Sequence, residues 1–271
     1  MTIGDMADKI RAIPTGGEDP WLNKEEDCIN ILYHCNKQLT LSTRLYSNGA
    51  ASISIDWGDG TPEYVTSRTT TGRFSEDTGL RHIYAKNGDY LIKIRLLSGK
   101  VMTDSSIDSN NGGFISKAGP DYGAIESAAV TKSQRKIYTP ANENLRLRNH
   151  IFYYIYCDEL EIHTQLTGNI SSFIAGYYGG DYVNIPNSPE VTSFGRDAFT
   201  QIYAWTFDFS EWTSIPQLSA AGNYVFVGTS YYKEIVVPDE LYDDWVIATN
   251  WADIASYIKK KSESKYYGGS V

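Results

Sequence analysis

The chain has 271 residues, of which 41% are hydrophobic and 21% charged, so it is a globular chain long enough for two modest domains. Its formal net charge of −9 argues against a nucleic-acid partner, because such partners are recognised through a basic surface. The 21 tyrosines are a high load, and tyrosine is frequent both in β-strands and on binding surfaces. No stretch of about 18 apolar residues occurs, so the sequence predicts no membrane-spanning helix.

Residues 1–20 form a predicted leader that contains a short amphipathic helix over residues 2–13. Ile3, Met6, Ile10 and Ile13 recur at helical spacing, and Pro14 ends the pattern. The segment lacks the apolar core of a secretory signal. We therefore expect a protein that is made in a cytoplasm and stays there, leaves by lysis or has lost a leader.

The cysteines are Cys28, Cys35 and Cys157, and an odd number argues against a disulfide framework. The apolar run 29–33 reads as a strand that would hold Cys28 and Cys35 too far apart to pair. The sequence predicts three reduced, buried thiols.

Residues 21–103 are predicted to form short strands separated by turns. Residues 52–57 alternate apolar and polar, as a half-buried strand does, and Gly-Asp-Gly-Thr-Pro at 58–62 is a tight turn. Residues 82–84 lead into Asn87-Gly88, a hairpin signal, and residues 90–96 form a closing strand.

Two phrases in this region, Ile-Asp-Trp-Gly-Asp-Gly-Thr at 55–61 and His-Ile-Tyr-Ala-Lys-Asn-Gly-Asp-Tyr at 82–90, together resemble the polycystic-kidney-disease (PKD) domain. The resemblance implies a seven-stranded immunoglobulin-like β-sandwich that serves as a spacer or interaction module. Its motif residues are Trp57, Asp59, Gly60, His82 and Tyr84. We predict that Trp57 fills the core and that Asp59 stabilises the turn. A Ca²⁺ site on Asp56 and Asp59 is the weaker alternative, because that ion takes about six to eight oxygens.

Residues 104–145 are polar and rich in turn formers, and we predict an interdomain connection with a short strand or helix near 124–138.

Residues 146–258 carry a different sequence pattern, with recurring phrases. Val-Thr-Ser-Phe-Gly-Arg-Asp-Ala-Phe at 191–199 and Trp-Thr-Ser-Ile-Pro at 212–216 resemble the repeat phrase of BspA-like leucine-rich repeats. The phrase at 237–251, with Trp245 and Trp251, resembles the closing cap of those arrays. Residues 239–258 are predicted as a capping helix, and 259–271, with Lys259–Lys261, as a solvated tail.

The predicted fold class is thus mainly β, an immunoglobulin-like β-sandwich plus a short leucine-rich-repeat-like β-solenoid with a C-terminal capping helix. The predicted divisions are 1–20, 21–103, 104–145, 146–258 and 259–271.

No catalytic, cofactor or metal motif stands out, so we predict no enzyme, no cofactor and no metal site. His34, His82, His150 and His163 are dispersed in the sequence. Cys157 with His163 lacks an orienting third residue, and a glycosidase pair of Glu159 and Glu161 would lie only about 6.6 Å apart at the backbone. Structural or solvated roles are favoured for all of them.

The signal for a binding surface comes from aromatic residues. Tyr177, Tyr178 and Tyr182 cluster in a Gly-rich loop, and Tyr231 and Tyr232 precede a predicted strand. Flat rings stack on sugars or anchor protein contacts, and strand filling is the alternative. Trp205 and Trp212 are predicted as repeat core.

These features favour a non-catalytic bacteriophage virion component: a tail fibre, baseplate or capsid-decoration protein. Its expected partners are other virion proteins, further copies of itself, and host cell-surface glycan or protein, without nucleic acid or membrane insertion. The phrase at 3–14 resembles helices that start tail-associated phage proteins of gut bacteria. The alternatives are a bacterial cell-surface adhesin or glycan-binding protein without its leader and, less favoured, a carbohydrate-active enzyme with these modules as accessories.

Overall fold

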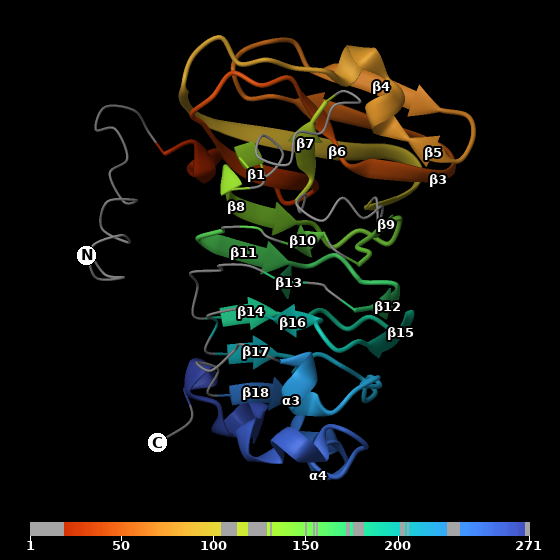
Figure 1. Ribbon diagram of the computed structural model, residues 1–271, viewed down its shortest axis with the longest axis vertical. Coiled ribbons are helices and arrows are strands. Elements are labelled where there is room, and N and C mark those ends of the chain that lie inside the picture. Colours follow the sequence, from red (N-terminus) through yellow and green to blue (C-terminus); the bar gives the residue numbers. More distant parts are fainter. Residues whose placement is uncertain are drawn as a thin grey trace.

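The chain is mainly β, with 43% strand, a few short helices, one antiparallel to mixed sheet and several small parallel sheets (Figure 1). The computed structural model describes residues 19–103, 113–118, 129–130, 132–149, 151–153, 155, 157–171, 174–175, 182–200, 204, 206–226 and 234–268. The predicted helix over 2–13 lies outside these residues. No helix in the described ranges is long and apolar enough to cross a membrane.

The largest sheet contains the strands of the N-terminal half in antiparallel order. Ile31, Ile53 and Ile92 lie on its inner face and are fully buried, as the alternation of the sequence predicts. The main strands are β1 (Cys28–Cys35), β6 (Gly88–Thr103), β3 (Leu45–Asp56) and β4 (Tyr64–Arg68), and β5 (Gly72–Arg73) pairs with β3.

Shorter elements accompany this sheet. β2 (Leu41–Thr43) and β7 (Ile115–Lys117) form a separate antiparallel pair. Three 3-10 turns complete the region: η1 (Pro20–Asn23), η2 (Phe74–Glu76) and η3 (Thr78–Leu80). Phe74 of η2 and Leu80 of η3 are buried in the same core as Ile31, so these two turns close the inner face of the sheet, whereas Trp21 of η1 packs in a separate cluster.

The large sheet continues into the second half of the sequence. β8 (Gln134–Thr139) pairs antiparallel with β1, and β11 (Glu159–Ile162) pairs parallel with β8. β9 (Leu145–Arg146) pairs parallel with β6. The segment 104–145, predicted as a connection, therefore contributes β7, β8 and the start of β9, and β8 overlaps the short strand or helix expected near 124–138.

Below this sheet the chain coils so that short strands stack in parallel (Figure 1). Partners on neighbouring strands lie 22 to 28 residues apart, as Gly168 and Val191 or Thr206 and Glu234 do. One ladder comprises β14 (Tyr182–Asn184), β17 (Thr206–Asp208), β18 (Glu234–Val237) and β19 (Ile258–Lys260). The others are β10 (Phe152–Tyr153) with β13 (Ile174–Ala175) and β16 (Phe199–Thr200), and β12 (Gly168–Ile170) with β15 (Val191–Phe194).

The interior of the coils is aromatic. Phe207 is buried with its ring 5.5 Å from that of Phe199, and Trp212 donates its indole N–H to the carbonyl of Ile185 at 2.7 Å. The predicted core position of Trp212 is confirmed, whereas Trp205 lies outside the described residues. Stacked rings of this kind bury apolar area that one coil cannot bury alone.

The C-terminal end corrects one expectation. The continuous helix predicted over 239–258 is wrong: the chain instead forms η4 (Asp239–Leu241), α4 (Tyr242–Trp245) and η5 (Ala252–Tyr257). Asn250 has φ 67°, a left-handed conformation that interrupts a helix. Trp245 and Trp251 are buried with ring centroids 5.3 Å apart, so the apolar spacing serves packing of short turns.

The expected solvated tail also differs in the structure. Residues 258–260 pair with β18, and η6 (Lys261–Glu263) and η7 (Lys265–Tyr267) follow. The short helix α3 (Gly222–Val225) contacts η5. The C-terminal segment therefore packs on the parallel ladder, and residues 269–271 lie outside the described ranges.

Candidate functional site

The turn that carries the PKD-like phrase is held by its own side chains. Trp57 is 3% exposed, its ring stacks on that of His82 at 4.8 Å, and its carbonyl accepts the Tyr84 hydroxyl at 2.7 Å. Asp59 accepts hydrogen bonds from the Thr61 amide (3.1 Å) and hydroxyl (2.7 Å) and lies 3.0 Å from His82. The predicted core position of Trp57 and turn-stabilising role of Asp59 are confirmed.

The electrostatics of this turn follow from the same contacts. Burial alone would raise the pKa of Asp59, but the Thr61 hydrogen bonds and the neighbouring His82 outweigh it, and the pKa is lowered. Gly60 has φ 85°, which favours glycine. Asp56 accepts the amide of Gly58 at 2.8 Å, so both carboxylates considered for Ca²⁺ serve the turn.

Of the five tyrosines predicted to bind a ligand, Tyr182 lies in the described part of the chain, and Tyr177, Tyr178, Tyr231 and Tyr232 lie outside it. Tyr182 is the first residue of β14 rather than part of a loop. The next side chain, Val183, is buried in the core, so Tyr182 points outward from the ladder.

Asp208 on the neighbouring strand β17 is the centre of a polar network on this outer face. It is 1% exposed and accepts the hydroxyls of Tyr182 and Tyr267, both at 2.5 Å, and the amide of Ser210 at 2.8 Å. Burial and the hydrogen bond to Asp208 raise the pKa of both phenols. These three hydrogen bonds use both carboxylate oxygens and tie η7 to the ladder.

A second buried acid holds the same segment. Glu234 on β18 accepts the hydroxyls of Thr206 (3.1 Å) and Ser264 (2.8 Å), and Ser264 in turn accepts the amide of Tyr266 at 3.2 Å. These contacts fix the backbone that precedes Tyr266 and Tyr267.

Three aromatic rings meet above these acids, and we call Tyr182, Tyr266 and Tyr267 the tyrosine cluster. Tyr182 and Tyr266 stack at 3.8 Å with planes 9° apart, and Tyr267 meets Tyr266 edge-on at 5.4 Å. Tyr266 remains 55% exposed and Tyr267 43%. Lys261 lies 5.0 Å from the centre of the Tyr267 ring and pairs with Glu211 at 2.6 Å. The cluster is a rigid aromatic surface bordered by charges.

Sequence reasoning missed Tyr266, Tyr267 and Asp208. The doublet of tyrosines after Ser264 is a local signal, since a serine that caps a turn indicates folded structure. No local pattern connects that doublet to Asp208, which is 59 residues from Tyr267.

The two acids considered for catalysis are bound by side chains of a segment near the N-terminus, and the thiol is buried beside them. Trp21 donates its indole N–H to Glu159 at 2.9 Å, and Lys24 binds Glu161 at 2.8 Å. His163 also pairs with Glu161, at 2.9 Å. Burial raises the pKa of the Cys157 thiol, which donates to the carbonyl of Glu159 at 2.7 Å. These contacts support structural roles, and His150 lies outside the described residues.

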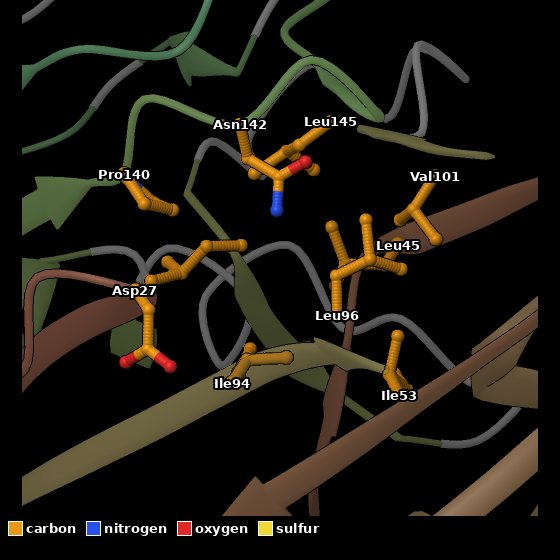
Figure 2. A pocket seen from close by; sticks show the side chains of 10 residues that line it. Asp27, Leu45, Ile53, Ile94, Leu96, Val101, Pro140, Asn142 and Leu145 are labelled. Carbon is orange, nitrogen blue, oxygen red and sulfur yellow. The ribbon is translucent and has the colours of Figure 1, made fainter. Parts of the chain in front are cut away.

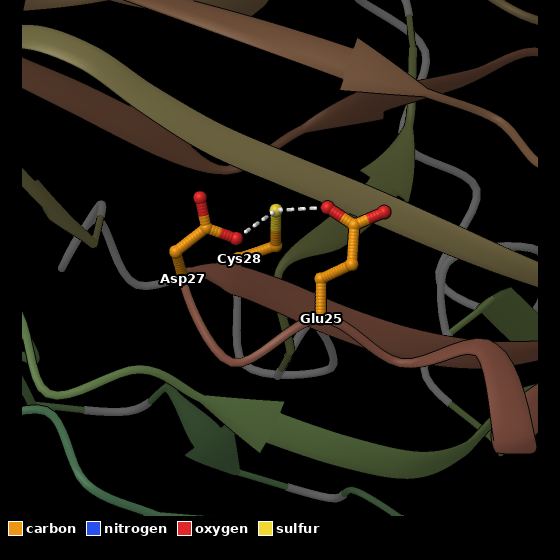
Figure 3. Close-up of side chains that lie close together, drawn as sticks. All are labelled: Glu25, Asp27 and Cys28. Atoms are coloured by element: carbon orange, nitrogen blue, oxygen red, sulfur yellow. Dashed lines mark hydrogen bonds between the residues drawn. The ribbon is translucent and has the colours of Figure 1, made fainter.

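One group of potential metal ligands is present in the described ranges. Glu25, Asp27 and Cys28 bring ligand atoms within 4.8 Å of one another (Figure 3). Lys93 binds Glu25 at 2.5 Å and Arg95 binds Asp27 at 3.1 Å. Burial raises the pKa of the Cys28 thiol to about 12, so the sulfur carries its proton. Lys93 and Arg95 therefore already balance the negative charges of Glu25 and Asp27.

A small cavity lies nearby between the large sheet and the residues after β8 (Figure 2). Its volume is about 10 Å³, room for a single water. Its walls include Ile94, Leu96, Pro140 and Leu145. It is too small for an organic ligand.

No known family model matches the chain, and neither curated proteins nor solved structures contain a significant match.

Proposed function

We propose that the chain is a non-catalytic bacteriophage virion component, a tail fibre, baseplate or capsid-decoration protein, that contacts the host cell surface. In this proposal the N-terminal half is a PKD-like, immunoglobulin-like β-sandwich and the C-terminal half a leucine-rich-repeat-like β-solenoid. The turn around Trp57 supports the first assignment. The parallel pairing of residues 23 apart, as Leu160 with Ile137, supports the second.

The observation that carries the attachment role is the tyrosine cluster. The rings of Tyr266 and Tyr267 are exposed, yet the Tyr267 hydroxyl is tied to Asp208, and the Tyr266 amide is tied through Ser264 to Glu234 on the neighbouring strand. Aromatic side chains held in place on regular structure lose little freedom on binding and act as anchors of recognition surfaces. A buried carboxylate whose two oxygens both accept hydrogen bonds suits a structural support better than a reacting group.

The test has two arms. Mass spectrometry of purified virions should detect the chain at a stoichiometry comparable with other structural proteins. The purified full chain, labelled with a fluorophore, should bind host cells, and Tyr266→Ala should reduce that binding. Absence from virions would refute the virion assignment.

Recovery in the outer-surface fraction of a bacterium instead, with a leader upstream in the native reading frame, would support the adhesin alternative. Hydrolysis of a host glycan by the purified chain would overturn the non-catalytic assignment.

A further inference from the structure

Tyr266 presents one ring face to solvent. Its other face is covered by Tyr182, parallel and 3.8 Å away, and Tyr267 meets its edge. With one face and one edge covered, the 55% exposure of Tyr266 lies on the remaining face and rim. Tyr267 has less free ring surface, because Lys261 lies over its ring at 5.0 Å from the centre.

The surroundings favour a small, polar occupant over a protein partner. Two residues shortly before the exposed rings in sequence, Glu263 and Lys265, are exposed and charged. Two rings within such a rim fall far short of the roughly 800 Å² that each partner buries in a stable protein interface. A pyranose ring needs no more than one aromatic face for its C–H groups, and its hydroxyls need hydrogen-bonding groups at the edge.

Charge limits the class of sugar. Lys261 is paired with Glu211, and Lys260 lies 5.1 Å from the centre of the Tyr242 ring, so two cations of this segment have partners in the protein. The exposed Lys265 is accompanied by the exposed Glu263. The chain as a whole has a formal net charge of −9, which disfavours the approach of polyanionic glycans. The Lys261–Glu211 pair still presents a donor and an acceptor to neutral hydroxyls.

We infer that the tyrosine cluster is a subsite for a neutral pyranose of a cell-surface glycan, with the sugar stacked on the outer face of Tyr266. This inference rests on the proposed attachment function and specifies its ligand class. Lys261, 5.0 Å from the centre of the Tyr267 ring, and its partner Glu211 are the polar groups assigned to the sugar hydroxyls, and Asp208 positions the cluster without touching the sugar.

The experiment is saturation-transfer NMR on the full chain with methyl α-glucopyranoside, methyl β-galactopyranoside and maltohexaose, and with trigalacturonate as the anionic comparison. The inference requires at least one neutral probe to give transfer to its ring C–H protons. Tyr266→Phe should retain the signal, because the flat ring remains. Tyr266→Ala should weaken binding about tenfold or more, as the loss of an aromatic anchor does.

Two further variants keep the result interpretable. Tyr224→Ala removes a tyrosine of similar exposure, 47%, whose ring faces Arg196, and should leave binding unchanged. Tyr266→Leu keeps apolar bulk against Tyr182 but removes the flat ring, so it should lose binding even if the alanine variant folds poorly. Thermal unfolding of each variant identifies losses of structure.

The inference is overturned if no neutral probe binds at millimolar concentration, if Tyr266→Leu binds as well as the parent chain, or if trigalacturonate binds more tightly than every neutral probe. Its failure is separable from that of the proposed function. If the chain is present in virions but binds no neutral sugar, the sugar subsite alone is refuted. If the chain is absent from virions, the virion assignment is refuted whatever the NMR shows.

Discussion

Replacement of Asp208 by alanine removes the acceptor that ties the C-terminal segment to the ladder. A hydrogen bond to a charged group stabilises a fold by about 1.5–3 kcal/mol. The amide of buried Ser210 would lose its partner completely, whereas the Tyr182 and Tyr267 hydroxyls lie on half-exposed side chains that regain part of the loss from water. We count the Ser210 amide as one full bond and the two tyrosine hydroxyls together as about one more. We therefore expect the free energy of unfolding to fall by roughly 3 kcal/mol.

Urea unfolding followed by circular dichroism measures this loss, and a double-mutant cycle assigns it. Tyr267→Phe alone should cost about 1 kcal/mol, but almost nothing once Asp208 is alanine, because the hydroxyl then has no carboxylate to bind. Asp243→Ala, at an exposed position, is the control and should stay within about 0.5 kcal/mol of the parent. The reasoning is refuted if Asp208→Ala costs less than about 1 kcal/mol, or if Tyr267→Phe costs the same in both backgrounds.

Two further predictions concern the turn at Trp57. Trp57→Ala should destabilise the fold by about 3–5 kcal/mol, because it deletes a buried ring that stacks on His82, and a negligible shift of the urea midpoint would contradict its core role. Because the pKa of Asp59 is lowered on folding, its stabilisation is fully present above its unfolded value of 3.8 and is lost as the pH falls through the lower folded pKa. Asp59→Asn should therefore show a smaller fall in thermal midpoint between about pH 5 and about pH 2 than the parent, and parallel curves would disprove the linkage.

The turn around Trp57 could be predicted because its determinants are local. Gly58 has φ 75° and Gly60 has φ 85°, backbone conformations that favour glycine at those points of the phrase. Asp59 and Thr61 bond across two residues. Such contacts leave a short, readable pattern in the sequence.

The tyrosine cluster could not be predicted in the same way. Its contacts join segments that become neighbours only when the coils stack, and Tyr182 lies 84 residues before Tyr266 in sequence. The lysines at 259–261 resemble a solvated tail because the pairing of β19 with β18 has no local mark. The apolar spacing of 241–258 fits a helix, yet the positive φ of Asn250 breaks it into short turns.

The placement of the cluster follows from the geometry of the ladder itself. Inward positions such as Val183, Phe207 and Ile235 are fully buried and must stay apolar for the coils to stack. Only outward positions are free to carry polar chemistry, and there Asp208 and Glu234 hold a segment from the far end of the chain. The exposed ring of Tyr266 is thereby fixed before any ligand arrives, which lowers the entropy cost of binding. A loss of affinity in a folded Tyr266→Leu chain would then report the lost ring contact rather than the ordering of a loop.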